Sequence, residues 1–406
     1  MPLRAKVASS VSRTAAALSR AAKRGDGSVI GGWLGLKIDP DLLRHLSAGR
    51  AIALITGTNG KTTTTRLAAA AVGVKGRVAT NSFGANLPTG HTSALANAGA
   101  TPYAVLEVDE HYLPRVLEAT QAKVVAFLNL TRDQLDRAQE VALLAQRWRS
   151  ALAEHPDVRV VANADDPLVV WAAIQHPTVV WFSAGQRWCD DSMICPDCGG
   201  SIERADDQWW CTGCPLRRPE PQWVVEDDGV VDPSGSWHKV VLQLPGRVNL
   251  GNAATALAIA AQFGVRPIEA VPRLAGVASV AGRYAQVVRD GRVIRLLLAK
   301  NPASWLEAFD MVEEAPTLLA INARDPDGLD TSWLYDVDFS PLRGRPVLVT
   351  GERAYDLAVR LEINEVPFQY VPTFAAAITA VPVGRLEVIA NYTAFQDIRA
   401  ELDRVN

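Results

Sequence analysis

Long apolar runs are missing from this 406-residue sequence, in which no stretch approaches the roughly 20 apolar residues of a bilayer-spanning helix. We therefore expect a soluble protein without a transmembrane segment. Residues 1–24 lack the continuous apolar core of a secretory signal, and they contain six Lys or Arg and no acidic residue. This balance would suit an organellar transit peptide, but we prefer an amphipathic helix that docks on the body of the protein or near a membrane surface.

A strong charge of either sign is also missing. The net charge is −3 and the isoelectric point is near 6.1, so no global field favours nucleic acid or an anionic membrane. Any such contact has to be local. The length exceeds what one hydrophobic core usually organises, and 48% apolar residues can fill well-buried interiors. We expect two or three domains.

Cysteine is scarce, yet four of the five cysteines form one pattern, Cys195-Pro-Asp-Cys198 and Cys211-Thr-Gly-Cys214. Two such turns, with glycines beside them, present four thiolates to a tetrahedral Zn²⁺ ion and indicate a structural zinc ribbon. A full thiolate set leaves no open coordination position for catalysis. Two disulfides are the competing interpretation, and they need an oxidising compartment that nothing else implies. Cys189 is most simply a leftover buried thiol.

The surface of this ribbon is not a basic stripe, because Glu203, Asp206 and Asp207 accompany Arg204. The composition argues against nucleic-acid binding. An inserted platform or partner contact is the better interpretation of the ribbon.

A phosphate-binding loop is the strongest functional signal. The apolar run Ala51–Ile55 predicts a buried strand, and a helical stretch follows the loop. The loop between them is Thr56, Gly57, Thr58, Asn59, Gly60, Lys61, Thr62 and Thr63. Its glycines let backbone N–H groups face an anion, Lys61 would meet the β- and γ-phosphates of ATP, and the Thr62 hydroxyl would meet Mg²⁺. A glycine turn with a chance lysine is the bland alternative. In the general phosphate-loop pattern a glycine stands five residues before Gly60, and here that position is Ile55. The departure limits the number of ATP-binding families to which the loop can belong.

Strand-like and helix-like segments alternate over most of the chain. Strands are expected at 104–106, 124–130, 158–162, 293–299, 317–322, 346–351 and 386–391. Such alternation predicts an α/β fold with parallel sheets covered on both faces. We expect a basic helical segment at 1–48, a central ATP-binding domain at 49–278 with the ribbon inserted at about 189–220, and a smaller Rossmann-like α/β domain at 279–406, with a hinge near 277–289.

Several motifs together resemble the Mur ligase superfamily, and within it the MurT family, from about Ser28 onward. They are the loop at 56–63, Asn86-Leu-Pro-Thr-Gly90, Leu106-Glu-Val-Asp-Glu110, Asn129-Leu-Thr-Arg-Asp-Gln-Leu-Asp136, the four-cysteine insertion, Gly246-Arg-Val-Asn-Leu-Gly-Asn252, Ala281-Gly-Arg283, Ala299-Lys-Asn-Pro302 and Trp333-Leu-Tyr-Asp-Val-Asp-Phe339. The loop alone would suit any Mur or folylpolyglutamate ligase. The ribbon and the Lys-Asn-Pro segment are similar to MurT in particular.

The resemblance implies a central P-loop ATPase domain and a glutamine-dependent carbon–nitrogen ligase of peptidoglycan biosynthesis. ATP would phosphorylate the α-carboxylate of the D-glutamyl residue in the lipid II stem peptide, and ammonia would displace phosphate to leave D-isoglutamine. The protein would position the groups and neutralise charge on the transferred phosphoryl group. ATP, Mg²⁺ and Zn²⁺ are the implied cofactors. The enzyme would be cytoplasmic and peripheral to the inner face of the plasma membrane when it acts on lipid II.

The resemblance also assigns roles to single residues. Glu107, at the end of an apolar strand, would be the second protein contact to Mg²⁺ beside Thr62, although a solvated strand-end carboxylate is the alternative. Asn249 and Asn252 would lie on the adenine side, or cap a helix, or do both. Arg283 would reach the γ-phosphate, or be a surface arginine. Asp133 and Asp136 would position the nucleotide or the metal shell, or simply start a helix.

Ammonia has to come from elsewhere, because no residue here has the setting of a glutaminase nucleophile. The resemblance implies a separate GatD-like glutaminase subunit in a heterodimer. Asp336 would orient the histidine of that partner's Cys–His pair, with Asp330 and Asp338 as close competitors. An exposed loop acid is the bland alternative.

Two other functions stay open. A single-chain ligase that adds an amino acid, as folylpolyglutamate synthase does, would share the loop and the fold without depending on ammonia or a glutaminase. A zinc-ribbon ATPase that binds nucleic acid is the other, and the acidic balance argues against it.

Overall fold

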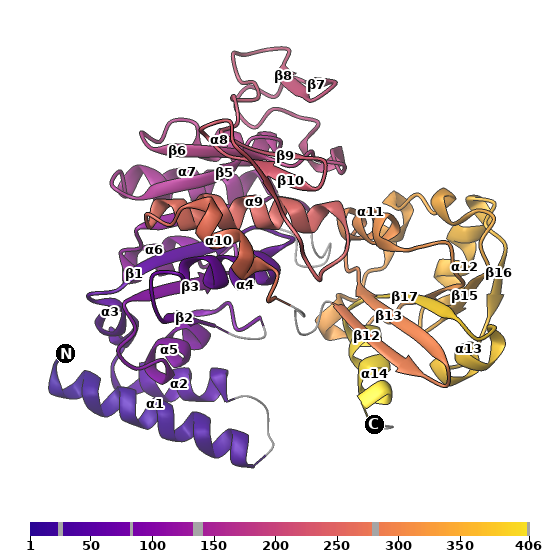
Figure 1. Cartoon of the computed structure of the whole chain (residues 1–406), viewed down its shortest axis with the longest axis horizontal. Coiled ribbons are helices and arrows are strands. Elements are labelled where there is room, and N and C mark those ends of the chain that lie inside the picture. Colours follow the sequence, from indigo (N-terminus) through magenta and orange to yellow (C-terminus); the bar gives the residue numbers. More distant parts are fainter. Residues whose placement is uncertain (23–26, 82–83, 133–140, 278–283, 404–406) are drawn as a thin grey trace. The chain divides into compact units, whose positions relative to one another are not determined.

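The computed structural model describes residues 1–22, 27–81, 84–132, 141–277 and 284–403 (Figure 1). The chain forms two compact units. Unit 1 comprises Met1–Leu130, Glu140–Gln243 and Arg247–Ala278, and unit 2 comprises Thr131–Gln139, Leu244–Gly246 and Ser279–Asn406. Within the described ranges, every helix is too short or too polar to traverse a bilayer. The domain boundaries at 48 and 278 stay predictions.

Unit 1 is built on a nine-stranded sheet with the order β11-β10-β9-β6-β5-β4-β1-β3-β2. The strands are β1 (Ala51–Thr56), β2 (Val78–Thr80), β3 (Tyr103–Glu107), β4 (Val124–Phe127), β5 (Arg159–Asn163), β6 (Val179–Ser183), β9 (Trp223–Glu226), β10 (Gly229–Val231) and β11 (Trp237–Lys239). The pairs from β2 to β9 are parallel, whereas β10 and β11 add an antiparallel edge. Parallel pairing places the carboxyl ends of β1 and β3 side by side, where the functional residues were expected.

Helices cover both faces of this sheet. Along β1, Ile52 and Leu54 enter one core and Ala53 and Ile55 enter the other, as alternation along a strand requires. The helices of unit 1 are α1 (Leu3–Ala21), α2 (Ser28–Ile38), α3 (Leu42–Ser47), α4 (Lys61–Val72), α5 (Pro88–Asn97), α6 (Leu113–Thr120), α7 (Val141–Glu154), α8 (Pro167–Ala173), α9 (Arg247–Gln262) and α10 (Pro267–Leu274). The core beneath Ala53 and Ile55 is closed by α4, α9 and α10. A strand buried on both faces explains why 51–55 is a continuous apolar run.

The four cysteines lie in an insertion between β6 and β9. It holds a short 3₁₀ turn (Asp190–Ser192) and the hairpin of β7 (Ile202–Ala205) and β8 (Gln208–Cys211), drawn beyond β6 in Figure 1. Two polar contacts fasten it to residues 164 and 165, which follow β5. The indole N–H of Trp209 donates to the Ala164 carbonyl at 2.9 Å, and Arg218 forms a buried ion pair with Asp165 at 2.9 Å.

Unit 2 has its own six-stranded sheet, with the order β12-β13-β17-β14-β15-β16. The strands are β12 (Tyr284–Arg289), β13 (Arg292–Leu298), β14 (Thr317–Ala320), β15 (Val347–Thr350), β16 (Phe368–Tyr370) and β17 (Arg385–Ala390). All pairs are parallel except the β12–β13 hairpin. Residues 284–289, at the end of the region where a hinge was expected, form the edge strand β12, and the position of the hinge stays a prediction.

Helices again pack on both sides of this second sheet. They are α11 (Pro302–Met311), α12 (Ala354–Ile363), α13 (Phe374–Ala380), α14 (Tyr392–Asp403) and the 3₁₀ turns η3 (Asp325–Asp327), η4 (Ser332–Asp336) and η5 (Ser340–Leu342). The predicted α/β class, with a central parallel-sheet domain, a cysteine insertion and a second α/β unit, is confirmed.

Candidate active site and metal centre

The loop between β1 and α4 has the backbone of an anion cradle. Gly57 and Gly60 have φ values of 137° and 83°, a region that favours glycine. A β-carbon at Gly60 would lie 2.7 Å from Asn252 Oδ1, so close approach also requires glycine there. Because α4 begins at Lys61, its first N–H groups and its dipole point into the loop. The arrangement suits the phosphates of a nucleotide.

Lys61 lies folded into this loop and is buried. Its Nζ donates to the Gly57 carbonyl at 2.6 Å and pairs with Glu110 Oε1 at 2.6 Å. The two side chains of the ion pair are only 5% and 11% exposed, so the pair is protected from solvent screening. Glu110 is itself fixed, because the Trp148 indole N–H donates to its carbonyl at 3.0 Å. Lys61 is thus paired with Glu110 in this structure. The phosphates of a bound nucleotide would replace Glu110 as the partner of the lysine.

Thr62 and Glu107, predicted as the Mg²⁺ contacts, lie together. The Thr62 hydroxyl donates to Glu107 Oε2 at 2.8 Å, and both residues are buried. Glu107 ends β3, next to β1 in the sheet. A hydroxyl and a carboxylate are hard oxygen ligands of the kind that Mg²⁺ takes alongside phosphate oxygens. The donor set therefore fits a magnesium ion.

Asn81 and His91 fix the backbone of Glu107, and no role was predicted for either residue from the sequence. Asn81 accepts from the Glu107 N–H at 2.8 Å and donates to its carbonyl at 2.9 Å. His91 Nε2 lies 2.7 Å from the same carbonyl and therefore donates to it. Burial lowers the pKa of His91 to about 4, so the ring is neutral near pH 7. His91 follows the quoted motif Asn86–Gly90, which was the available signal.

Asn129 clamps the phosphate loop from β4. Its carbonyl accepts from the Thr58 N–H at 3.0 Å, and its side chain accepts from the Asn59 N–H at 2.8 Å. Glu110 and Asn129 were part of quoted motifs, but their partners lie 49 and 70 residues away. No local pattern could assign those contacts.

Asn249 and Asn252 lie in the first two turns of α9, and both are buried. Asn252 accepts from the Thr64 hydroxyl at 3.0 Å and donates to Asn249 Oδ1 at 3.0 Å. They therefore lie against the phosphate-loop helix, and an adenine-side role stays a prediction. Arg283, Asp133 and Asp136 fall outside the described residues.

The four cysteines of the ribbon converge. The Sγ atoms of Cys195, Cys198, Cys211 and Cys214 all lie within 4.8 Å of one another. The Cys195–Cys214 and Cys198–Cys211 pairs are 3.6 and 3.4 Å apart, close to the roughly 3.8 Å between thiolates on a tetrahedral zinc ion. The Gly200 and Gly213 N–H groups donate to Cys198 and Cys211. Donor type, number and spacing fit a structural zinc ion.

Asp336 lies in unit 2 at the end of η4. Its carboxylate forms an ion pair with Arg132 at 3.2 Å, and it is 36% exposed. Asp330 accepts from the Ser332 N–H at 2.8 Å, which lowers its pKa. Asp338 accepts from both the N–H and the hydroxyl of Ser340. Both neighbours thus support the turns around them, whereas Asp336 pairs with a partly exposed arginine.

Comparison with known proteins places the chain. The family model for the Mur ligase middle domain matches residues 55–260, and the model for the MurT ligase C-terminal domain matches residues 298–395. The MurT subunit of lipid II isoglutaminyl synthase (glutamine-hydrolyzing) from Staphylococcus aureus is 28% identical, over 93% of each chain. The Streptococcus pneumoniae subunit of that name is also 28% identical, over 92% of each chain.

A solved structure carries the same fold. A pseudomurein peptide ligase type C from Methanothermus fervidus superposes with a TM-score of 0.69 at 16% identity, covering 90% of this chain and 81% of that one. At this identity the likeness shows the architecture alone. With the family models and the phosphate-loop geometry, it leads to one conclusion: the chain belongs to the Mur ligase superfamily and carries the C-terminal domain of the MurT ligases.

Proposed function

We propose that the protein is the synthetase subunit of a glutamine-dependent lipid II isoglutaminyl synthase. It would amidate the α-carboxylate of D-glutamate in the lipid II stem peptide, using ATP and ammonia from a GatD-like glutaminase partner. The buried arrangement of Lys61, Thr62 and Glu107 at the carboxyl ends of β1 and β3 carries the proposal. The relatives named above supply the substrate class.

The reaction has two steps. A carboxylate oxygen of the substrate attacks the γ-phosphorus of ATP, and the bond to the β-γ bridging oxygen breaks, which releases ADP and leaves an acyl phosphate. Ammonia then attacks the acyl carbon, loses a proton, and phosphate departs. The loop N–H groups and Lys61 would neutralise charge on the transferred phosphoryl group, while Thr62 and Glu107 would hold Mg²⁺, which would supply further positive charge to the phosphates. Glu110 would accept Lys61 again once the nucleotide leaves.

The environment of Asp336 supports a role toward a partner. An aspartate that orients a histidine across an interface has to be accessible, and its carboxylate oxygens cannot all be occupied by hydrogen bonds within its own turn. Asp336 meets this condition better than Asp330 and Asp338, whose carboxylates accept backbone N–H groups. Arg132 pairs with the Asp336 carboxylate at 3.2 Å, and the histidine of the partner would take its place when the partner docks.

An exposed apolar stripe beside Asp336 supports the same partner. Tyr355, Val359 and Ile363 recur every four residues along α12 and are 74%, 49% and 59% exposed. Tyr370 stacks on Tyr355 with ring centroids 5.7 Å apart. The Arg360 guanidinium lies over the ring of Tyr335, one residue before Asp336, at 4.7 Å from the ring centroid. Exposed tyrosines with an arginine are the composition of interface hot spots.

This surface also weighs against the single-chain amino-acid ligase, which needs no partner beside its C-terminal domain. In the ribbon, Trp209 and Arg218 are already bound to Ala164 and Asp165, so these two side chains are not available to a nucleic acid. Its four thiolates would hold Zn²⁺ as a structural ion. With a lipid-linked substrate, the enzyme would work in the cytoplasm at the inner face of the plasma membrane.

The decisive experiment is co-expression with a GatD-like glutaminase, followed by mass analysis of lipid II incubated with ATP, Mg²⁺ and glutamine. The expected product is one mass unit lighter than the acid, and its formation requires all three reagents or ATP, Mg²⁺ and ammonium. If the pair hydrolyses glutamine and ATP but leaves the muropeptide acid unamidated, the proposal is overturned. Addition of a whole amino acid would instead establish the single-chain ligase.

A further inference from the structure

The two N-terminal helices carry an unusual concentration of exposed apolar side chains. Residues 1–33 contain seven of the 26 large hydrophobic residues that are exposed in the described part of the chain. Single exposed apolar residues are normal on soluble proteins, but a cluster indicates a contact surface. α1 and α2 pack together and onto α5 in unit 1 (Figure 1).

The helix α1 is amphipathic with its larger residues outward. Its buried side consists of Ala5, Ala8, Ser12 and Ala16. At 3.6 residues per turn, Leu3, Val7 and Leu18 fall on the opposite side, and they are 79%, 50% and 65% exposed. A helix that only docks on its own domain would turn its leucines inward.

The contact between α1 and α2 shows why small residues face inward. A β-carbon at Gly31 of α2 would lie 2.7 Å from the Ser12 carbonyl oxygen, and one at Gly35 would lie 3.2 Å from Ser12 Cβ. The two backbones approach closely, so no leucine fits between them. α2 likewise turns large side chains outward, since Val29, Ile30 and Trp33 are 61%, 49% and 51% exposed.

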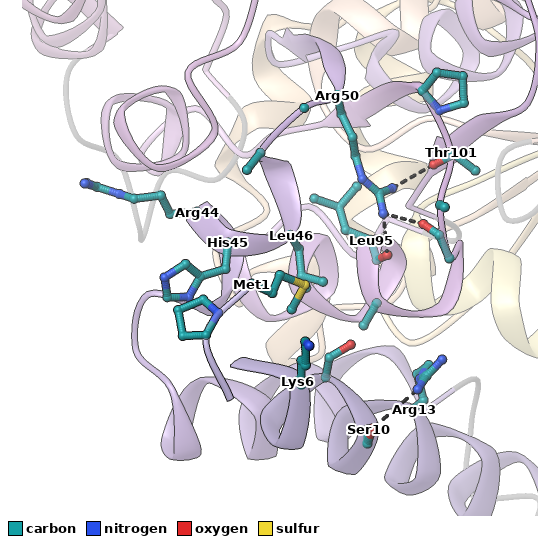
Figure 2. Close-up of a pocket in the computed structure, with 18 residues that line it drawn as sticks. Met1, Lys6, Ser10, Arg13, Arg44, His45, Leu46, Arg50, Leu95 and Thr101 are labelled. Atoms are coloured by element: carbon teal, nitrogen blue, oxygen red, sulfur yellow. Dashed lines mark hydrogen bonds between the residues drawn. The ribbon is translucent and has the colours of Figure 1, made fainter. Parts of the chain in front are cut away.

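Positive charge borders the outward face of α1. Lys6 and Arg13 lie one heptad apart along one flank, Arg4 lies on the other, and residues 1–24 contain no acidic residue. Lys6 and Arg13 also line a pocket of about 840 Å³ whose other walls include Arg44, His45 and Arg50. Figure 2 shows both side chains projecting from α1 into this pocket. Cations that flank an apolar face are typical of helices that lie in the interface of an anionic bilayer.

The α12 stripe of unit 2 is the informative contrast. It is equally apolar, but Asp356 and Glu362 share its helix with Arg360, so its charge is mixed. Mixed charge suits a protein partner, whereas a face bordered only by cations suits a surface of one negative sign.

We propose that the outward face of α1, with Val29, Ile30 and Trp33 of α2, is a docking surface for an anionic phospholipid bilayer. The apolar side chains would enter the acyl boundary, and Lys6 and Arg13 would meet headgroup phosphates. This docking surface rests on the proposed function, because it would hold the enzyme at the membrane where a lipid-linked substrate lies. Its test needs no substrate, so the two can fail separately.

The experiment measures sedimentation of the full-length protein with vesicles of equal parts phosphatidylglycerol and phosphatidylcholine, or of phosphatidylcholine alone. Binding is expected on the anionic vesicles, with steep loss between low and high salt. Lys6→Gln with Arg13→Gln should weaken it about 25-fold, at about fivefold per charge. Val7→Ser with Leu18→Ser should weaken it about tenfold or more.

Matched controls keep the result specific. Lys239→Gln with Arg266→Gln removes the same charge elsewhere, and Val241→Ser with Val383→Ser removes comparable exposed apolar groups. Both control pairs should bind within about twofold of the wild type, because bilayer attraction decays within a Debye length.

Three outcomes would overturn the docking surface. The wild type does not sediment with anionic vesicles, or the α1 pairs bind as well as their controls. In the third, the lipid-free wild type is a dimer that Val7→Ser with Leu18→Ser converts to a monomer, which would make the face a contact between copies. Amidation of lipid II in detergent micelles separates this inference from the proposed function, since the α1 variants should retain it. If no amidation occurs while vesicle binding responds as expected, only the proposed function is lost.

Discussion

We propose functional roles both for the phosphate loop of unit 1 and for Asp336 of unit 2. The two regions differ in whether their polar side chains find partners within the chain. In the loop, Lys61 and Thr62 are buried and paired with Glu110 and Glu107. In unit 2, Asp336 is over a third exposed, and its neighbour Tyr335 and the α12 side chains Tyr355, Val359 and Ile363 are exposed as well.

We interpret this difference as a distinction between residues that act within this chain and residues that act on a partner subunit. A site that transfers a phosphoryl group gains from preorganised donors in a dry setting, because they need no reorganisation during the reaction. A residue that completes a partner's site has to stay accessible. Burial should therefore predict which variants respond to the nitrogen source and which do not.

The largest effect is expected from Lys61→Ala, which should lower ATP-dependent amidation about a thousandfold with either glutamine or ammonium. The reason is that the loop would lose the cation that we propose neutralises the transferred phosphoryl group. Lys75→Ala, at the exposed end of the same segment, is the matched control and should retain activity. Turnover and zinc content are measured together.

A companion variant separates chemistry from stability, because Lys61→Ala leaves Glu110 buried without its cation. Lys61→Ala with Glu110→Gln removes that unpaired charge and should regain stability in urea without regaining amidation. Recovery of turnover by the double variant would show that the lysine only balanced the acid.

Asp336→Asn should act on one nitrogen source alone. Glutamine-dependent amidation is expected to fall about a hundredfold or more, because an asparagine would not stabilise the charged histidine that we propose Asp336 contacts in the partner. Activity with ammonium should persist. Asp338→Asn is the control, since its carboxylate accepts from Ser340. Equal loss with both nitrogen sources would remove the contrast between the two regions and place Asp336 in the synthetase site or in the fold.

Sequence reasoning succeeded where function follows a local pattern. The loop at 56–63 lies between β1 and α4 as expected, and Glu107 ends the neighbouring strand. The four cysteines meet because each pair lies in one turn. The strands of unit 2 were found within one or two residues, except for β12 and β16. These two are edge strands, whose half-exposed residues lack a continuous apolar run.

The remaining contacts depend on tertiary structure. Asn129 reaches the loop because β4 lies beside β1, and His91 reaches Glu107 because α5 packs on β2, the neighbour of β3 in the sheet. Neither neighbour can be identified from spacing along the chain. In α1 the basic pattern was apparent from sequence, but which side faces outward depends on the close approach of α2.

The buried His91 ring, which fixes the backbone of Glu107, should make the free energy of unfolding depend on pH. Burial lowers the pKa of His91 to about 4 from the ordinary 6.5, so the folded state favours the neutral ring. Its contribution to stability is present above pH 6.5 and is lost as the pH falls toward 4, by up to about 3 kcal/mol. The same span should change the stability of His91→Gln less, because glutamine does not titrate. Urea unfolding at pH 7.5 and 4.5 gives the comparison. An identical pH response in both proteins would contradict it.

The smallest expected effect concerns the α12 stripe, and it addresses the other side of the contrast. Tyr355→Ser with Val359→Ser should weaken binding of the glutaminase subunit about tenfold, as expected for an interface anchor that loses its apolar area. Because unit 2 buries neither side chain, its folding should be unaffected, and ammonium-dependent amidation should match the wild type. Val288→Ser with Val383→Ser removes exposed apolar groups on the same unit and is the control. Titration calorimetry with the partner measures the affinities. If both pairs bind the partner equally well, the glutaminase docks elsewhere, and the exposure of Asp336 then needs a different cause.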